Sequence, residues 1–209
     1  APNTDTKYTV EYYYAENGVY PSTANSSDVR QGTTLATVSV TDEDKVPTET
    51  GYAFHNGYSG NVLAGTIAGD GSLVLKVYFK EQFTVKYQPG DKGNFAEQST
   101  GSLDYNATTP AFAGDTTDCA AGYHFTGWSP TVADKVTANA TYVAQWAPNA
   151  DTAYRVEFYK QADGAYPATA DSFVTRTGTT DTTASVTDAD KTAPAGYAFD
   201  SAAGNVLSG

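Results

Sequence analysis

The sequence predicts a mainly β protein, of the β-rich α+β kind, built from small sheet modules with little helix. Three features of the composition predict this class. The chain is 40% hydrophobic and 13% aromatic, which is enough for packed cores. Its aromatic residues are chiefly tyrosine, with 16 Tyr against 9 Phe and 2 Trp, and Tyr, Val and Thr favour the half-buried surface of a strand. Met is absent and Leu is scarce, whereas amphipathic helices commonly depend on both.

Alternation of side chains places the main strands. The first part of the chain opens with a strand at residues 8–14 and closes with one at residues 72–79, which follows a tight GDG turn at residues 69–71. The second part opens with a strand at residues 83–87 and closes with one at residues 142–146. Because the first and last strands of each part are similarly long and apolar, we expect them to pair or to lie centrally in one sheet.

The chain contains a long internal repeat. Tyr8 opens the segment YTVEYY, and the similar segment YRVEFY begins at Tyr154, so the offset is 146 residues. Further along, GVYP at residues 18–21 is matched by GAYP at residues 164–167. Roughly half of the aligned positions are identical, which chance does not produce. Active sites are rarely duplicated along a chain, whereas stalks and multivalent binders are repetitive, so the repeat favours the latter.

The repeat divides the chain into two linkers and three modules. The linkers are residues 1–7 and residues 147–153. The modules are A1 at residues 8–82, B at residues 83–146 and A2 at residues 154–209. A1 passes into B without a linker, which predicts a stiff joint, and the short proline-containing linker before A2 predicts at most a limited hinge.

A2 is expected to be truncated at its C-terminal hairpin, because it has no counterpart of residues 66–82. We therefore expect its sheet to keep an unpaired edge, which invites strand pairing with a neighbouring chain. The chain begins at Ala1 and stops at Gly209 without a signal peptide or wall-sorting motif, and we expect it to be part of a longer protein.

Charge and residue types argue against several classes of function. The formal net charge is −12, and so acidic a chain binds neither nucleic acid nor an anionic membrane surface. No apolar run is long enough to predict membrane insertion. The single cysteine, Cys119, cannot form a disulfide within the chain. No nucleophile triad, acid–base pair or cofactor motif is present, so we expect a protein that is not an enzyme and has no cofactor.

Module B contains GYHFTGW at residues 122–128 and ATYVAQW at residues 140–146, after the opening FTVKYQPG at residues 83–90. These motifs resemble the internalin-type B-repeat, also called the Listeria–Bacteroides repeat, of bacterial surface proteins. In that family a GYxFxGW segment precedes a closing strand that ends in AxW. The resemblance covers nearly all of B and implies a small β-grasp-like fold.

Module A1 contains YTVEYY at residues 8–13, the pair Gly51-Tyr52 and GSLVLKVY at residues 71–78. These segments resemble the mucin-binding-protein type of repeat of Gram-positive surface proteins. Together the two resemblances imply tandem β-grasp-like modules, with antiparallel or mixed sheets, in an extracellular array on a bacterial cell wall. They do not show that this chain binds mucin, because many such repeats have no established ligand.

Tyrosines of the A modules are the candidate ligand-binding residues, since surfaces rich in Tyr, Asn, Ser and Gly suit polar ligands such as glycans. The candidates are Tyr13, Tyr20, Tyr52 and Tyr58 in A1, with Tyr159, Tyr166 and Tyr197 in A2.

In module B, Tyr123, Phe125 and Trp128 are either a sugar-stacking platform or part of a core that includes Trp146; we favour the core. His124 alternates away from its aromatic neighbours, and we expect it at the surface.

Asp42 and Asp44, repeated as Asp188 and Asp190, have the alternate spacing of oxygen ligands in calcium loops. The glycine and distal Glu of a full loop are absent. A solvated turn or the start of a brief helix, with Thr41 as its cap, is therefore favoured, and we predict no metal site.

Two functions fit these observations. In the first, the A modules act in adhesion and bind a host or mucus glycoprotein or glycan, weakly at each module and more tightly through multivalency. In the alternative, the array is a stiff structural spacer that presents a distal adhesin and has no ligand of its own. Tyrosines gathered in a concave patch in both A modules would favour adhesion, and scattered tyrosines would favour the spacer.

Overall fold

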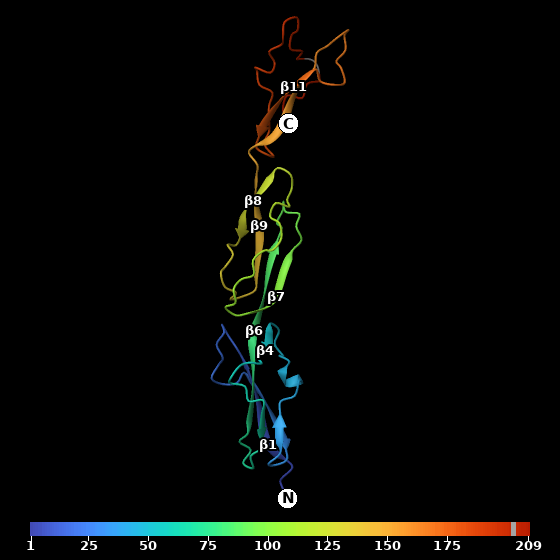
Figure 1. Cartoon of the computed structure of the whole chain (residues 1–209). Helices are drawn as coiled ribbons and strands as arrows, with labels where there is room; N and C mark the ends of the chain where they lie inside the picture. Colours follow the sequence, from blue (N-terminus) through green and yellow to red (C-terminus); the bar gives the residue numbers. More distant parts are fainter. Residues whose placement is uncertain (202–203) are drawn as a thin grey trace. The chain divides into compact units, whose positions relative to one another are not determined.

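The computed structural model describes residues 1–201 and 204–209, and it is mainly β, as the composition predicts (Figure 1). The strands in chain order are β1 (Thr6–Tyr14), β2 (Ser26–Gly32), β3 (Thr37–Ser39), β4 (Tyr52–Phe54), β5 (Ala64–Thr66), β6 (Val74–Gln88), β7 (Gln98–Asp104), β8 (Tyr123–Ser129), β9 (Ala140–Pro148), β10 (Thr152–Phe158) and β11 (Ser172–Gly178). No helix in the described part of the chain is long and apolar enough to cross a membrane.

The chain forms two compact units. The first comprises Ala1–Gln88, Glu97–Gly114 and Trp128–Val143, and the second comprises Pro89–Ala96, Asp115–Gly127 and Ala144–Gly209. Modules A1 and B therefore contribute together to the first unit, while A2 lies wholly in the second.

The sheet of A1 is built around β1. Strand β2 pairs with β1 in antiparallel fashion from Thr6↔Gly32 to Tyr12↔Ser26, and β6 pairs with its other edge in parallel from Thr9↔Val74 to Tyr14↔Phe79. The predicted pairing of the first and last strands is thus confirmed in A1. The core beneath this sheet consists of apolar side chains that alternate along the strands, and its fully buried members are Val10, Ile67, Leu75, Val77 and Phe79.

Strand β6 runs without interruption through the boundary between A1 and B. It extends from Val74 to Gln88, so the two strands that the sequence places at residues 72–79 and 83–87 are one (Figure 1). Its second half pairs with β7 in antiparallel fashion and with β9 in parallel, from Val85↔Ala140 to Gln88↔Val143. The first and last strands of B are therefore also neighbours, as predicted.

The part of B that belongs to the first unit has its own core of Val85, Tyr87, Val136 and Tyr142. Trp128 packs edge-on against Tyr87, with ring centroids 4.8 Å apart. Trp128 is therefore a core residue, as predicted, but it belongs to a different unit from Tyr123, Phe125 and Trp146, with which the sequence grouped it.

In the second unit, Trp146 packs against other aromatic rings. Its ring centroid lies 5.7 Å from that of Phe125 and 6.3 Å from that of Phe95, and its Nε1 donates to the carbonyl oxygen of Pro89 at 2.7 Å. Phe125 and Trp146 therefore pack together as predicted. His124 is exposed, also as predicted, and its Nδ1 lies 2.8 Å from Oδ1 of Asn149.

The segment predicted as a linker before A2 is largely β structure. Strand β9 continues to Pro148 and β10 begins at Thr152. Between them, the amide of Asn149 donates to the carbonyl of Gly122 at 2.7 Å, and the amide of Thr180 donates to the carbonyl of Asn149 at 2.9 Å. These bonds tie the start of A2 to the tip of B within the second unit.

The brief helix is confirmed as one 3-10 turn, η1 (Glu43–Lys45), and the Oγ1 of Thr41 accepts from the amide of Asp44 at 3.2 Å. It is the only helix in residues 1–201 and 204–209. A β-grasp-like architecture for the modules stays a prediction.

Candidate functional site

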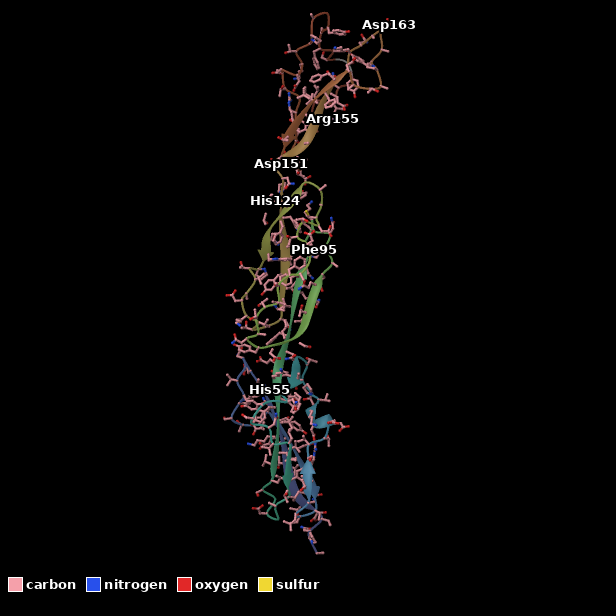
Figure 2. The ribbon with its side chains drawn as sticks, in the orientation of Figure 1. His55, Phe95, His124, Asp151, Arg155 and Asp163 are labelled. Atoms are coloured by element: carbon pink, nitrogen blue, oxygen red, sulfur yellow. The ribbon has the colours of Figure 1, made fainter. Side chains whose placement is uncertain are left out.

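Four tyrosines and a histidine meet on one side of the A1 sheet, and we call them the aromatic cluster: Tyr13, Tyr20, His55, Tyr58 and Tyr78. The rings of Tyr13 and Tyr78 stack with centroids 4.4 Å apart and planes 10° apart. Tyr20 lies 4.4 Å from Tyr58 and 4.9 Å from Tyr78, centroid to centroid. Figure 2 shows where His55 lies along the ribbon.

Strand pairing and one tight turn position the cluster. Tyr13 on β1 and Tyr78 on β6 are Cα partners in the parallel ladder, so their rings stand side by side. Tyr20 follows a turn in which Asn17 and Gly18 have φ of 53° and 75°, the left-handed conformation that Asn and Gly tolerate best.

Asn61 fixes the loop that carries His55 and Tyr58. Its side-chain amide donates to the carbonyl of His55 at 2.8 Å, and its Oδ1 accepts from the amide of Tyr78 at 3.1 Å. A Cβ at Gly60 would lie 2.5 Å from the ring of Tyr58, so the close approach of this ring requires glycine there.

The hydroxyls of Tyr13 and Tyr20 have raised pKa values. The hydrogen bond to Glu11 at 2.6 Å, helped by burial, raises the pKa of Tyr13 well above its ordinary value. Burial raises the pKa of Tyr20 to about 12, and its hydroxyl lies 2.7 Å from Nδ1 of His55. Such hydroxyls can exchange hydrogen bonds with a polar ligand, and the half-buried rings of Tyr20 and Tyr58 can stack on the apolar face of a sugar.

The structure gathers three of the four tyrosines predicted for A1 and separates the fourth. Tyr13, Tyr20 and Tyr58 belong to the cluster, although Tyr13 is only 4% exposed and presents almost no surface to a ligand. Tyr52 instead packs edge-on against Tyr14 at 5.0 Å, beside the core. Sequence reasoning missed Tyr78 and His55. The signal for Tyr78 was available, since alternation along β6 puts it on the face opposite to Leu75, Val77 and Phe79.

The predicted tyrosines of A2 all line one cavity. Tyr159, Tyr166 and Tyr197 are 42%, 42% and 49% exposed, and they border a hollow of about 1720 Å³. The hydroxyl of Tyr166 donates to Asp200 at 3.0 Å, where Tyr20 meets His55 in A1. Figure 2 places Arg155 at the strand pair of A2 and Asp163 in the loop beyond it.

The weak calcium candidates bind cations of the protein itself. Both carboxylate oxygens of Asp44 accept from the guanidinium of Arg30, at 2.6 and 2.8 Å, and further bonds come from the Tyr12 hydroxyl and the Thr41 amide, each at 2.7 Å. The hydrogen bond from Arg30 holds the pKa of Asp44 far below its usual range. A carboxylate with four such donors has no acceptor position left for a metal.

The other acidic candidates also pair with basic side chains. Asp190 holds Arg176 with both oxygens, and the exposed Asp42 and Asp188 pair with lysines three residues on. Within residues 1–201 and 204–209, no group of three or more His, Cys, Asp and Glu side chains is placed to hold a metal ion.

No protein-family model matches the chain, and no curated protein matches it. The resemblance of modules A and B to bacterial surface repeats therefore rests on their motifs and stays a prediction.

Proposed function

We propose that this chain is a non-enzymatic, force-bearing spacer within an extracellular array of repeats. The observation that supports it most is the arrangement of strands in the first unit. Strand β1 pairs in parallel with β6, and β6 pairs in parallel with β9. The strand that enters each module is therefore the hydrogen-bonded neighbour of the strand that leaves it.

This geometry determines how tension along the chain acts on the hydrogen bonds. Tension pulls β1 towards its N-terminal end and β6 towards its C-terminal end. Because the two strands are parallel and adjacent, they slide along one another, and all the bonds between them are strained together. An antiparallel hairpin pulled at its open end instead loses its bonds one at a time. The β1–β6 and β6–β9 pairs thus resist extension in series.

The joint between A1 and B is fixed from two sides. On one side, Asp104 of β7 accepts from Lys80 Nζ at 2.6 Å and from the side-chain amide of Gln82, both on β6. On the other side, the amide of Gly18 donates to Glu81 at 2.8 Å, and a Cβ at Gly18 would lie 2.6 Å from the ring of Tyr105. A spacer needs joints that do not fold back, and these contacts supply one.

The test is single-molecule stretching of the full chain in a Cys119→Ser background, with handles attached at introduced cysteines. Handles at Asp5→Cys and Gln88→Cys pull β1 and β6 from opposite ends. Handles at Glu16→Cys and Gln88→Cys peel the same two strands apart from one end and serve as the matched control. We expect a severalfold higher rupture force in the first geometry. Equal forces in the two geometries would contradict the proposal.

A second candidate is adhesion through the aromatic cluster. It is favoured by the half-buried rings of Tyr20, His55 and Tyr58, and by the gathering of tyrosines in both A modules, which is the arrangement expected of an adhesive surface. Titration of the chain with mucin glycopeptides tests it, with Tyr58→Ala compared with Tyr52→Phe. Adhesion requires saturable binding that Tyr58→Ala abolishes and Tyr52→Phe retains. Binding that is absent, or unaffected by Tyr58→Ala, removes this candidate.

A further inference from the structure

Two Asn-Gly dipeptides occur in the chain, Asn17-Gly18 and Asn56-Gly57, and both lie in module A1. In such a dipeptide the main-chain nitrogen of glycine can attack the preceding side chain, because glycine has no Cβ to hinder the approach. The nitrogen gives its proton to solvent base and bonds to Cγ of the asparagine, and the side-chain amide leaves as ammonia. Water then opens the resulting succinimide ring. Opening at the side-chain carbonyl gives aspartate, and opening at the main-chain carbonyl gives isoaspartate.

The fold protects the first of these dipeptides. The amide of Gly18 donates to a carboxylate oxygen of Glu81 at 2.8 Å, so the nitrogen that would attack is already engaged. Two backbone hydrogen bonds between Glu16 and Val19, at 2.9 and 3.0 Å, close the turn around it, and both Asn17 and Gly18 have left-handed conformations. Attack on Cγ would require this nitrogen to leave Glu81 and the turn to open.

The second dipeptide lacks these restraints. Asn56 and Gly57 are exposed, and within residues 1–201 and 204–209 the amide of Gly57 makes no hydrogen bond. A Cβ at Gly57 would meet no atom within 4 Å, so the space beside this residue is open. The two residues form the middle of a turn that one bond closes, from the amide of Tyr58 to the carbonyl of His55 at 3.0 Å. They therefore have room to rotate until the nitrogen meets Cγ.

We propose that Asn56 is a modification site, at which spontaneous deamidation through a succinimide yields aspartate and isoaspartate while Asn17 stays intact. The reaction needs only water and solvent base, and it is independent of the proposed spacer function.

The effect of this reaction falls on the aromatic cluster, because the turn at residues 55–58 carries two of its rings. The rings of His55 and Tyr58 lie 5.4 Å apart, centroid to centroid, and that of Tyr58 lies 4.4 Å from Tyr20 and 4.7 Å from Tyr78. Isoaspartate routes the main chain through the former side chain, which adds one atom to the turn.

The longer turn moves Tyr58 in preference to His55. The side chain of Asn61 holds the carbonyl of His55 at 2.8 Å, whereas the carbonyl of Tyr58 accepts a longer bond, of 3.2 Å, from the amide of Asn61. The ring of Tyr58 is close-packed, since a Cβ at Gly60 would lie 2.5 Å from it, so a shift of the main chain separates it from its neighbours. The aromatic cluster is therefore ordered in a newly made chain and loosens as the chain ages.

Module A2 provides a comparison within the same chain. Asp200 and Asn205 are the counterparts of His55 and Asn61, and the sequence between them is SAAG, without an Asn-Gly pair. At the position of Asn17, A2 has Asp163, which has φ of 52° in a turn of the same left-handed kind. Ageing should therefore modify A1 and leave A2 unchanged.

The test is incubation of the full chain in warm, mildly alkaline buffer, followed by mass spectrometry of its tryptic peptides. Trypsin separates the two dipeptides, since Asn17 lies in residues 8–30 and Asn56 in residues 46–76. We expect the second peptide to show the mass gain of an NH2-to-OH exchange at Asn56 severalfold faster than the first shows it at Asn17. An isoaspartate methyltransferase should label the second peptide. In urea, where the fold is lost, the two sites should convert at similar rates.

Two variants separate the steps of the proposal. Gly57→Ala is the matched control, because its methyl group would enter open space and the φ of Gly57 is not positive. It should slow the conversion many-fold and leave the cluster intact. Asn56→Asp brings the charge without the added main-chain atom. Nuclear Overhauser contacts between the rings of Tyr20 and Tyr58 should persist in Asn56→Asp and disappear in chains that contain isoaspartate.

Several results would overturn the proposal. Absence of conversion at Asn56 in the folded chain would do so, as would conversion of Asn17 at an equal or higher rate. Slower conversion of Asn17 in urea would show that neighbouring residues, and not the fold, protect it. Ring contacts of Tyr58 that survive in chains with isoaspartate would remove the effect on the aromatic cluster.

Discussion

Modules A1 and A2 contain nearly the same hairpin in two different surroundings. Both keep the strand register and the arginine–aspartate pair. Both also keep the turn that precedes Tyr20 in A1 and Tyr166 in A2. They differ in pairing: β1 lies between β2 and β6, whereas β10 pairs with β11 alone in the described residues. The hairpin and its ion pair are therefore properties of the local sequence, whereas burial of the aromatic side chains depends on a third strand.

One matched pair of residues makes the difference measurable. Tyr13 donates to Glu11 and Tyr159 donates to Glu157, so both side chains point the same way along their strands. Tyr13 is 4% exposed and Tyr159 is 42% exposed. The same residue is a core side chain in one module and a surface side chain in the other.

The largest expected effect follows from truncating the centre of β6. Phe79 is fully buried and its ring lies 4.8 Å from that of Tyr14. Phe79→Ala should lower the free energy of unfolding of A1 by about 3–5 kcal/mol. The measurement is amide hydrogen exchange at increasing denaturant concentration. Amides of β1 report the stability of A1, and amides of β10 report the stability of A2. The β1 amides should lose protection while the β10 amides keep theirs, and equal losses would contradict the division into two units.

Truncating the matched tyrosines should give unequal results. Tyr13→Ala removes a ring that stacks on Tyr78, and it should destabilise A1 by about 3 kcal/mol. Tyr159→Ala should leave the unfolding midpoint of A2 unchanged, because this side chain is 42% exposed. If the two substitutions proved equally harmful, Tyr159 would have a partner in solution that A1 does not need.

The ion pairs should behave alike in the two modules, in contrast to the tyrosines. Asp44 is 5% exposed, and Asp44→Asn should cost A1 about 2 kcal/mol, because charge-assisted bonds from Arg30 are lost. Asp190→Asn should destabilise A2 in the same direction. A neutral result in A2 would mean that its hairpin does not depend on the pair.

The same carboxylate predicts how A1 responds to acid. The folded-state pKa of Asp44 lies below its unfolded value, so its stabilising contribution is complete at neutral pH. The contribution should decline as pH falls below about 4, the ordinary value for aspartate. Urea titrations across this range should show a shallower decline for Asp44→Asn than for the unchanged chain, and parallel curves would contradict the assignment.

The smallest expected effect concerns the hydroxyl of Tyr20. Tyr20→Phe removes its bond to His55 and should cost A1 about 1 kcal/mol, measured as a shift of the denaturation midpoint. Tyr166→Phe provides the comparison, because its hydroxyl bonds to the exposed Asp200 instead. A larger loss of stability in A2 than in A1 would contradict the view that burial determines how much each hydroxyl hydrogen bond stabilises its module.

Much of the fold could be predicted from alternation and repetition. The mainly β class, the pairing of first and last strands, the short helical turn after Thr41 and the packing of Phe125 with Trp146 are all present, although the N-cap of that turn is Asp42. These features depend on side chains near in sequence or on motifs with fixed spacing.

Other features depend on partners that no local pattern specifies. The spacing of Asp42 and Asp44 suggests oxygen ligands, but it does not show that Arg30 on β2 binds Asp44. Tyr52 and Tyr58 look equivalent in sequence, yet one packs beside Tyr14 and the other joins the aromatic cluster. The union of two predicted strands into β6 was hidden by the polar residues Lys80 and Glu81 between them.

The shared strand β6 also constrains how such a protein can evolve. Successive side chains of a strand point to opposite faces, so inserting or deleting one residue between Phe79 and Phe83 would turn the B half of β6 over relative to its A1 half. Recombination that breaks the chain outside β6, and so exchanges A and B as a pair, leaves this register untouched. The internal repeat fits this constraint. Its offset of 146 residues spans one A module and one B module together, so the unit that is repeated is the A–B pair.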